Sequence, residues 1–239
     1  MSRMERKYLA HYIDASFGGQ VQGLANPTYV RLGKDLESYS EELNPQVDVR
    51  RNILGEQNVI HNGYQVQSTA EPFYADEDDL LFQPIASVAN YRKTGAACQT
   101  TRIECLVDAT GKQIWAYKED CWVVPNNVGG DTSGVQIPFN VYNAGNRVPG
   151  QFNMSTKAFN ASSVTLNKSS TSIARGADET LTATKVPSSA TGYTVVWKSS
   201  DTSKATVNQS GKVTGVAVGS CVITAEWFGA RASCAVTIT

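Results

Sequence analysis

Four consecutive acidic residues, Asp76 to Asp79, are the strongest candidates for chemistry in this sequence. Carboxylates at this density can bind a hard cation or work as a general acid and base. A calcium loop, however, places its ligands at alternate positions around a turning glycine, whereas Leu80, Leu81 and Phe82 follow these acids directly. We therefore interpret the acids as the negatively charged start of a helix and not as a metal or catalytic site.

Other chemistry would require a nucleophile with a base beside it, or metal ligands at a characteristic spacing. The chain has two histidines, His11 and His61, and neither has such a partner in its sequence context, so we expect structural roles for both. Cys98, Cys105 and Cys121 lack the C-x-x-C spacing of zinc sites. The sequence therefore predicts a protein that is not an enzyme and that holds no cofactor and no metal.

The acids begin a segment, Asp76–Gly95, that has the pattern of an amphipathic helix. Its apolar residues recur along one side of such a helix: Leu80, Leu81, Ile85, Val88 and Ala89. We expect the helix over about residues 78–92, with Asp78 or Asp79 as its cap. A single helix among strands is expected to cover one face of a β-sheet.

The rest of residues 1–160 has the pattern of short β-strands separated by turns. Residues 100–108 and 112–124 flank a tight turn and predict a β-hairpin. Asn62-Gly63 lies between two β-prone runs, which predicts another hairpin that turns at this dipeptide. The first domain, residues 1–160, is therefore predicted to be mainly β with one flanking helix.

A change in composition after residue 160 indicates a second domain, residues 161–239. This part is rich in Ser, Thr, Val and Ala, and its β-prone runs recur about every ten residues without a helix signal. That pattern predicts a small β-sandwich. Cys221 and Cys234 should face inward from two neighbouring strands, about four residues out of register, so no disulfide is expected between them.

The formal net charge is −1, which gives no sign of binding to nucleic acid or to a membrane. Residues 1–160 carry a balance of −4 and residues 161–239 a balance of +3. The N-terminal residues MSRMERKYLAHYIDAS lack the apolar run of a signal peptide, and no stretch is long and apolar enough to span a membrane. We therefore expect a chain that is made and folded in the cytoplasm.

Residues 162–239 contain the segments VTLNKSSTSIARG and VVWKSSDTSKATVNQSGKVTGVAVGSCVITAE. By these segments this part of the chain resembles the bacterial immunoglobulin-like domains of group 2. It implies an immunoglobulin-like β-sandwich, in which four apolar residues are expected to form the core: Trp197, Val207, Ile223 and Val236. Domains of this family are binding or spacer modules on adhesins and on phage virion proteins.

A second set of recognisable segments covers most of residues 29–160: YVRLGKDLE, ELNPQVDVRRNILGE, EPFYADEDDLLF, YRKTG, CWVVPNNVGGDTSGVQIPFNVYNAGNRVPGQF and TKAF. By these segments the first domain resembles the major tail proteins, or tail tube proteins, of long-tailed (siphovirus-type) phages of Gram-positive hosts. The resemblance implies a phage tail tube fold, with two packed β-sheets in a barrel-like arrangement and one flanking α-helix. It also implies that six subunits close into a ring and that the rings stack into a hollow tail.

On this resemblance the protein is a structural protein of the virion, assembled in the host cytoplasm. Its expected partners are further copies of itself, the tape measure protein and other tail proteins. DNA passes through the lumen during ejection without specific binding, and a mildly acidic first domain suits a wall that does not hold phosphate. The immunoglobulin-like domain would lie on the tube exterior, where weak contact with host cell-wall glycans is expected. The alternative is a cell-surface adhesin whose immunoglobulin-like module binds glycans.

One polar segment, QVDVRRNILGE at residues 46–56, is expected to be an arm that reaches the adjacent ring. Five of its residues are the candidate contacts: Gln46, Asp48, Arg50, Arg51 and Glu56. The two arginines are expected to pair with acids of the neighbouring subunit. The alternative for this segment is a disordered surface loop.

Overall fold

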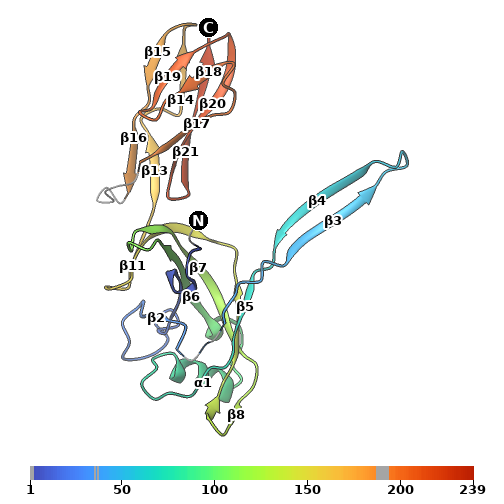
Figure 1. The fold of residues 1–239 in the computed structure, drawn as a ribbon, viewed down its shortest axis with the longest axis vertical. Helices are drawn as coiled ribbons and strands as arrows, with labels where there is room; N and C mark the ends of the chain where they lie inside the picture. Colours follow the sequence, from blue (N-terminus) through green and yellow to red (C-terminus); the bar gives the residue numbers. More distant parts are fainter. Residues whose placement is uncertain (1–2, 35, 37, 187–193) are drawn as a thin grey trace. The chain divides into compact units, whose positions relative to one another are not determined.

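The computed structural model describes residues 3–34, 36, 38–186 and 194–239. The chain forms two compact units, Met1–Arg147 and Val148–Thr239. Strands dominate both units, as the sequence predicts, and a single α-helix is present in the described ranges (Figure 1). The second unit begins with an antiparallel pair, β11 (Val148–Asn153) and β12 (Ala158–Ala161). The boundary that composition indicates, after residue 160, lies at the end of this pair.

The first unit is organised around one antiparallel sheet with the strand order β5–β10–β7–β6–β1–β2. Its strands are β1 (Leu9–Asp14), β2 (Tyr29–Arg31), β5 (Gln67–Ala70), β6 (Gln99–Val107), β7 (Gln113–Pro125) and β10 (Phe139–Asn143). The predicted hairpin is confirmed as β6 and β7. Strand β7 is 13 residues long, so its first part pairs with β6 and its last part with β10. The two packed sheets that the tail tube resemblance implies stay a prediction.

Several short elements complete the first unit. Two 3-10 helices, Arg6–Tyr8 (η1) and Gly95–Cys98 (η2), precede β1 and β6. Strands β8 (Gly129–Asp131) and β9 (Gly134–Gln136) form a small separate hairpin.

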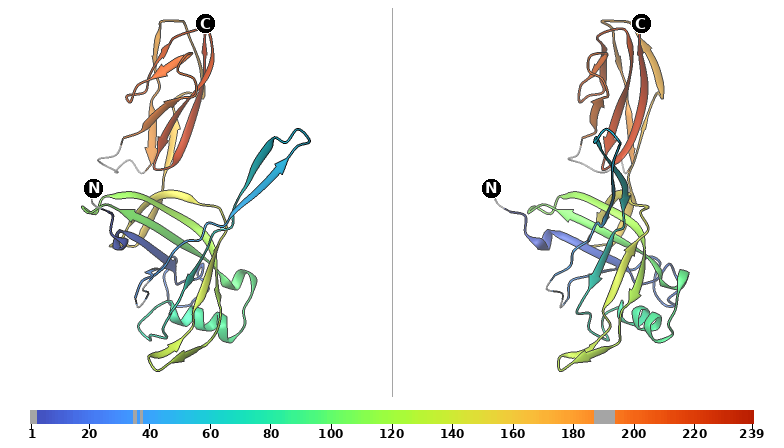
Figure 2. Two further views of the ribbon diagram at one scale, coloured as in Figure 1. Left: turned by 45° about the vertical axis from the view of Figure 1, so that its right-hand side comes forward. Right: turned by 90° about the vertical axis from the view of Figure 1, so that its right-hand side faces the viewer.

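Helix α1 (Phe82–Asn90) packs against β7 and covers one face of the sheet (Figure 2). Leu81, Ile85 and Val88 are buried. They share a core with Val123 of β7 and Phe139 of β10. The helix therefore takes the covering position that its apolar stripe predicts.

The helix begins later than the sequence indicates, and neither Asp78 nor Asp79 is its cap. The residue that flanks its N-terminus is Leu81, which makes no side-chain capping bond. Asp76 and Asp79 instead accept hydrogen bonds within the preceding turns, from the backbone N–H groups of Asp78 (3.0 Å) and Leu81 (2.8 Å). Aspartate stabilises turns in this way, by accepting from a backbone N–H two residues on. Leu80 lies in these turns, is 49% exposed, and so does not join the buried stripe.

Strands β3 (Pro45–Arg51) and β4 (Gln57–Tyr64) form an antiparallel hairpin, which we call the arm. The arm extends away from the sheet of the first unit and pairs with no other described strand (Figures 1 and 2). The segment expected to be either a polar arm or a disordered loop is thus half of an ordered β-hairpin.

The prediction of a turn at Asn62-Gly63 is wrong, because both residues lie within strand β4. Gln46 pairs with Gly63 and Val47 with His61, so β4 carries one extra residue and forms a β-bulge here. Gly63 has φ 120°, a conformation that only glycine adopts without strain. A bulge and a tight turn both use glycine in this way, which explains why the dipeptide misled the prediction.

The second unit contains an immunoglobulin-like β-sandwich. Its strands are β13 (Ser163–Leu166), β14 (Ser170–Ile173), β15 (Asp178–Thr180), β16 (Ala183–Val186), β17 (Val196–Ser199), β18 (Ala205–Val207), β19 (Lys212–Gly215), β20 (Gly219–Trp227) and β21 (Ala230–Ile238). The order β14–β21–β20–β17 forms one sheet, β15–β19–β18 a second, and β13 pairs with β16. The structure places Trp197, Ile223 and Val236 in the core of this unit, with Val207 partly buried against it.

The two cysteines of this core are free and buried. Cys221 pairs with Val236, and Cys234 pairs with Ile223, so the cysteines are offset by two residues and not by the expected four. The difference arises because the turn between β20 and β21 is tighter than predicted, since the strands pair up to Trp227 and Ala230.

Candidate functional site

The arm has one apolar and one more polar face. Residues that lie directly opposite each other in an antiparallel pair share a face, and successive residues alternate between faces. Val49 therefore shares a face with its partner Val59, and Val47 with His61. The other face carries Asp48, Arg50, Asn58 and Ile60.

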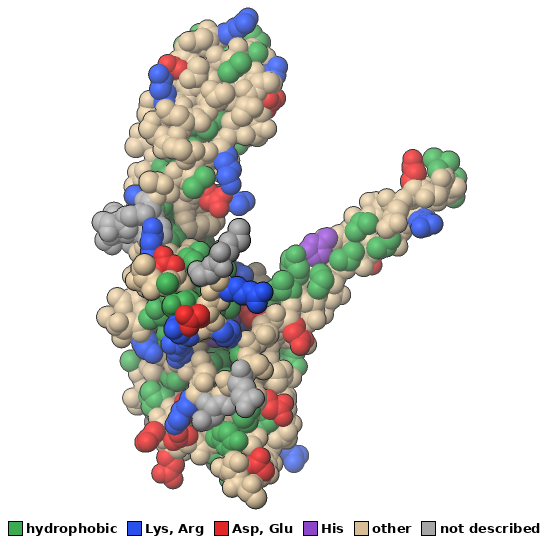
Figure 3. Space-filling model, in the orientation of Figure 1, with side chains coloured by type: hydrophobic (Ala, Val, Ile, Leu, Met, Phe, Trp, Pro, Cys, Tyr) green, Lys and Arg blue, Asp and Glu red, His purple; other side chains and the backbone are tan. Residues whose placement is uncertain are grey.

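The apolar face of the arm is open to solvent. Val49 is 58% exposed and Val59 is 56% exposed. Ile53 and Leu54, at the tip, are also exposed. Figure 3 shows hydrophobic side chains along the length of the arm. An exposed apolar strip of this kind typically marks a surface that another molecule covers.

The tip of the arm is held in shape by Asn52. Its side-chain oxygen accepts hydrogen bonds from the backbone N–H groups of Leu54 and Glu56, each at 3.0 Å. Its side-chain nitrogen donates to the carboxylate of Glu56 at 2.6 Å. The turn is therefore built by local hydrogen bonds, and the apolar tip residues are free to contact a partner.

The predicted contact residues of the arm do not lie together on one face. Asp48 and Arg50 lie on the more polar face and form an ion pair with each other at 3.6 Å. Arg51 lies on the opposite face, with Val49. Gln46 donates to the backbone carbonyl of Asn44 at 3.1 Å, near the start of the arm. The feature that sequence reasoning missed is the apolar face, which becomes visible only when β3 and β4 are paired.

The root of the arm, where it leaves the sheet, is fixed by backbone hydrogen bonds. Glu42 and Gln67 exchange two of them, at 2.8 and 3.1 Å. Closer to the arm, the backbone N–H of Gln65 donates to the carbonyl of Asn44 at 3.2 Å, and the Asn44 side chain donates back to the carbonyl of Gln65 at 3.1 Å. Since Gln67 belongs to β5, this ladder connects the arm directly to the main sheet.

A cluster of buried charged residues lies beneath this root. Arg102 of β6 is 4% exposed and donates to the carboxylate of Glu41, from the segment before the arm. The same guanidinium contacts Glu104 at 3.3 Å. His11 of β1 is also buried, with its Nδ1 atom 3.6 Å from a Glu41 oxygen. Side chains from two strands and from the arm root therefore meet in this cluster.

Glu104 has further partners of its own. It accepts hydrogen bonds from the indole N–H of Trp115 at 2.9 Å and from Arg147 at 2.7 Å. The Arg147 guanidinium also lies 4.0 Å from the centre of the Tyr117 ring. The position of Glu104 is therefore determined by the body of the first unit, independently of the arm root.

Burial shifts the pKa values of this cluster. The pKa of Glu41 is raised to about 7, first by burial and then by its hydrogen bond with Glu104. Burial and the nearby Arg102 lower the pKa of His11 to about 4. Burial alone would raise the pKa of Glu104, but hydrogen bonding to Glu41 and the charge of Arg147 lower it. Near neutral pH, His11 is therefore uncharged.

Three potential metal ligands are present in the cluster. One atom each from His11, Glu41 and Glu104 lies within 4.8 Å of the others. The two carboxylates, however, already contact the guanidinium groups of Arg102 and Arg147. This balance of charge favours an ion-pair network over a cation site. The ring nitrogens of His11 have no hydrogen-bond partner among the described residues, and the ring lies against Tyr39, with centroids 4.8 Å apart.

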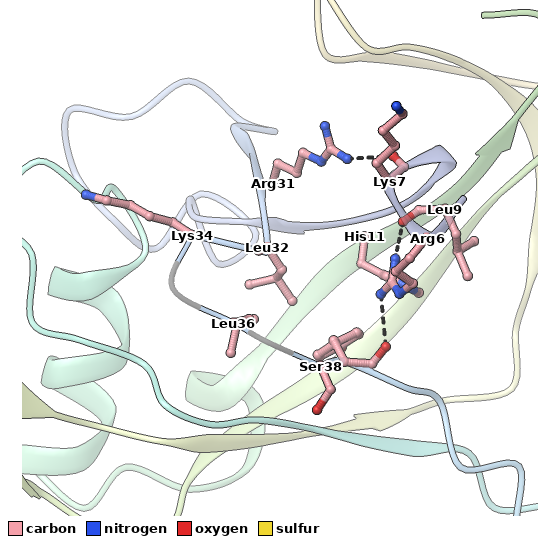
Figure 4. Close-up of a pocket in the computed structure, with 11 residues that line it drawn as sticks. Arg6, Lys7, Leu9, His11, Arg31, Leu32, Lys34, Leu36 and Ser38 are labelled. Atoms are coloured by element: carbon pink, nitrogen blue, oxygen red, sulfur yellow. Dashed lines mark hydrogen bonds between the residues drawn. The ribbon is translucent and has the colours of Figure 1, made fainter. Parts of the chain in front are cut away.

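A cavity of about 410 Å³ opens beside the cluster, with His11 in its wall (Figure 4). Four basic residues also line it: Arg6, Lys7, Arg31 and Lys34. Arg6 donates to the backbone carbonyl of Tyr39 at 2.9 Å, and Arg31 donates to that of Lys7 at 3.0 Å. These bonds hold the segment around η1 against β2 and against the residues that lead to the arm.

Among the described residues, Asp76 to Asp79 do not belong to a group of side chains placed closely enough to hold a metal ion. Asp76 forms an ion pair with Lys34, and Asp79 is used in the turn before α1. His61 lies on the arm, where its ring contacts Tyr64 with centroids 4.6 Å apart. The described helices include none that is long and apolar enough to cross a membrane.

Comparison with known proteins identifies one part of the chain. Residues 160–226 match the family of bacterial Ig-like domains, group 2. The second unit therefore carries a domain of this family, as the sequence predicts. The chain is also similar to an uncharacterized protein of Clostridium acetobutylicum, with 39% identity over 82 residues, which cover 33% of this chain and 8% of that protein. The matched region is thus a small part of that relative.

Proposed function

We propose that this protein is a structural subunit that assembles with copies of itself into stacked rings, which form the tail tube of a long-tailed phage. The arm is the observation that carries the proposal. It exposes an apolar face and an apolar tip, and a two-stranded hairpin alone is at best marginally stable in water. An element of this kind becomes stable when a partner surface covers it, which supports a role in assembly.

The length of the arm suits contact with a neighbouring subunit. Strand β3 has 7 residues, which corresponds to a reach of about 23 Å at ~3.3 Å per residue. The main sheet of the first unit also ends in short strands, since β2 and β5 each pair with one other strand of that sheet. Open edges of this kind can accept a strand from another copy. Both features favour self-association over function as a monomer.

In this proposal each ring contains six subunits, as the resemblance to tail tube proteins implies. The rings enclose a lumen through which DNA passes without specific binding, and the mildly acidic first domain is consistent with such a lumen. The tape measure protein and other tail proteins are the further partners. The immunoglobulin-like domain lies outside the tube, and the protein is part of the virion.

Negative-stain microscopy of the purified protein tests the proposal, with Val59→Asp as the decisive variant. The substitution places a charge on the apolar face of the arm, so we expect wild-type protein to form hollow tubes and this variant to remain monomeric. The matched control is Asn58→Asp, which adds the same residue to the same strand on the other face. Tubes of normal appearance from Val59→Asp would contradict the role of the arm.

The ionic part of the arm is tested separately. Replacement of both Arg50 and Arg51 by glutamate is expected to prevent tube formation and to leave a folded monomer, if the arginines pair with acids of the next ring. The ion pair of Arg50 with Asp48 within the arm makes Arg51 the better candidate for an external contact. Normal tubes from the double variant would show that the arginines make no essential ionic contact, and the apolar face would remain as the proposed contact surface.

A second candidate function is binding of cell-surface glycans, which the match to the bacterial Ig-like family favours. The balance of +3 over residues 161–239 would assist contact with anionic wall polymers. Sedimentation with purified Gram-positive cell walls measures this binding. If deletion of residues 162–239 leaves the bound fraction unchanged, this domain is not the binding element.

A further inference from the structure

We propose that Glu41 is a positioning residue that sets the direction of the arm and thereby the readiness of the subunit to assemble. The proposal rests on the function proposed above, because it treats the arm as an assembly element. Glu41 precedes Pro45, the first residue of β3, by a short segment. Its carboxylate reaches into the body of the first unit and contacts Arg102.

The contact with Arg102 is difficult to break. Arg102 is 4% exposed, and the side chain of Glu41 is 12% exposed. Withdrawal of one member of a buried ion pair leaves the other charge without water or a full set of partners, which is strongly unfavourable. The segment that leads into β3 is therefore held against β6 by its side chain.

The other side of the root is held in a different way. Gln67 is part of β5, and its backbone bonds with Glu42 connect the two chains of the root. The hydroxyl groups of Tyr39 and Ser68 also lie 2.6 Å apart and are buried. Without Glu41, the described bonds that still attach the root to the body lie along β5, between Asn143 and Val66, and at Tyr39. The arm would then turn about this line, which acts as a hinge.

Arg102 and Glu104 can remain paired without Glu41, whereas the arm root depends on Glu41 for its contact with Arg102. Loss of Glu41 should therefore affect the position of the arm more than the folding of the first unit. If Glu41 is removed, Arg102 keeps a carboxylate partner in Glu104. Glu104 is itself held by Trp115 and Arg147, so it does not depend on the arm root. The body of the first unit is therefore expected to stay folded while the arm loses its fixed direction.

A loosened arm would lower the affinity of assembly without any change in the contact surface. The apparent affinity of a protein falls in proportion to the fraction of molecules that hold the binding-competent conformation. If one molecule in ten has a correctly directed arm, about tenfold more protein is needed for assembly. We therefore expect Glu41→Ala to raise the critical concentration for tube formation, by about tenfold if one arm in ten is correctly directed.

The direction of the arm is measured by pulsed electron paramagnetic resonance on full-length protein with two spin labels. Leu54→Cys labels the tip, and Ala109→Cys labels the exposed turn between β6 and β7. The five native cysteines are buried, so the label attaches to the introduced thiols. The protein carries Val59→Asp to keep it unassembled, and each variant is compared in this background.

We expect a narrow distance distribution for the parent and a broad one for Glu41→Ala. Glu41→Gln should restore the narrow distribution, because its amide oxygen can still accept the hydrogen bond from Arg102. Glu42→Ala is the matched control, since it removes a neighbouring exposed carboxylate and keeps the backbone bonds with Gln67. A narrow distribution in Glu41→Ala, or a broad one in the parent, would overturn the proposal.

A thermal scan of each variant separates positioning from general destabilisation. Loss of stability in Glu41→Ala with an unchanged distance distribution would assign Glu41 a structural role only and overturn the proposal. The distances are measured on unassembled protein, so they remain informative even if wild-type protein forms no tubes. Absence of tubes contradicts the proposed function, whereas the distance distributions alone decide the role of Glu41.

Discussion

Substitution of Glu41 or of His11 should uncover two pH dependences of stability that cancel in the wild-type protein. Glu41 has a usual pKa of 4.5 and a folded pKa of about 7. Below pH 4.5 it is protonated in both states, and between 4.5 and 7 only the unfolded state loses the proton. The stability that this group contributes is therefore complete below pH 4.5 and is lost as the pH rises to 7.

His11 has the opposite sign. Its pKa falls from 6.5 to about 4 on folding. Above pH 6.5 it is neutral in both states, and as the pH falls to 4 only the unfolded state gains the proton, so stability is lost on acidification. One proton of difference changes the free energy of unfolding by about 1.4 kcal/mol per pH unit. Between pH 4.5 and 6.5 the two groups act in opposite directions and nearly cancel.

Glu41→Gln removes one side of this balance. Relative to wild type, its free energy of unfolding should rise by about 1.4 kcal/mol per pH unit, or roughly 3 kcal/mol from pH 4.5 to 6.5. The free energy of unfolding of His11→Gln, relative to wild type, should fall by a similar amount over the same pH range. Urea unfolding at several pH values, on protein treated with a chelator, measures both slopes. Glu42→Gln and His61→Gln are the controls, because neither residue belongs to the buried cluster.

The comparison with wild type cancels the titrating groups outside the buried cluster, because all the variants share them. If Glu41→Gln runs parallel to wild type between pH 4.5 and 6.5, then Glu41 has no raised pKa in the folded protein. The hydrogen bond between Glu41 and Glu104, which is one cause of the raised pKa, would then be absent. If only His11→Gln changes the slope, burial perturbs the histidine but not the carboxyl group.

Three further outcomes follow from the packing. Leu81→Asp should prevent folding of the first unit, because it buries a charge in the core, whereas Leu80→Asp at an exposed position should give folded protein by circular dichroism. Gly211→Ala should lower the free energy of unfolding by about 2–5 kcal/mol, because Gly211 has φ 83° and a Cβ there would lie 2.3 Å from the carbonyl oxygen of Leu181. Gly176→Ala is the control: Gly176 has φ 81° and no atom within 4 Å of an added Cβ, so the loss should be only about 1–2 kcal/mol. A thermal scan of both variants measures the difference. The five buried cysteines should react with a thiol reagent slowly in native protein and rapidly in denaturant; fast reaction of the native protein would show that the cores open readily.

Local patterns in the sequence were enough to predict elements that depend on neighbouring residues. The hairpin of β6 and β7 was found because a tight turn joins two β-prone runs. Helix α1 was found because Ile85 and Val88 repeat at helical spacing. Its start was misplaced because Asp76 and Asp79 stabilise turns as well as helix ends, and the sequence does not distinguish these uses.

The buried cluster could not be predicted, because its members are far apart in the chain. Arg102 and Glu104 lie on the same side of β6, and two charged residues on one face of a strand are a signal that a polar interior exists. Nothing local indicates that Glu41, from a separate segment, completes the group. The apolar face of the arm was missed for a related reason, since Val49 and Val59 become neighbours only through long-range pairing.

The bulge in β4 has a consequence for how this protein can vary by mutation. Bulges bend a strand and increase its twist, so the extra residue, Asn62, contributes to the path of the arm. Loss of Asn62 would leave the pairs Gln46–Gly63 and Val47–His61 adjacent, with the same side chains on the apolar face. The course of the arm and the composition of its contact surface are thus encoded by different residues. A deletion of one codon could redirect the arm and keep its chemistry, so the two properties can evolve separately.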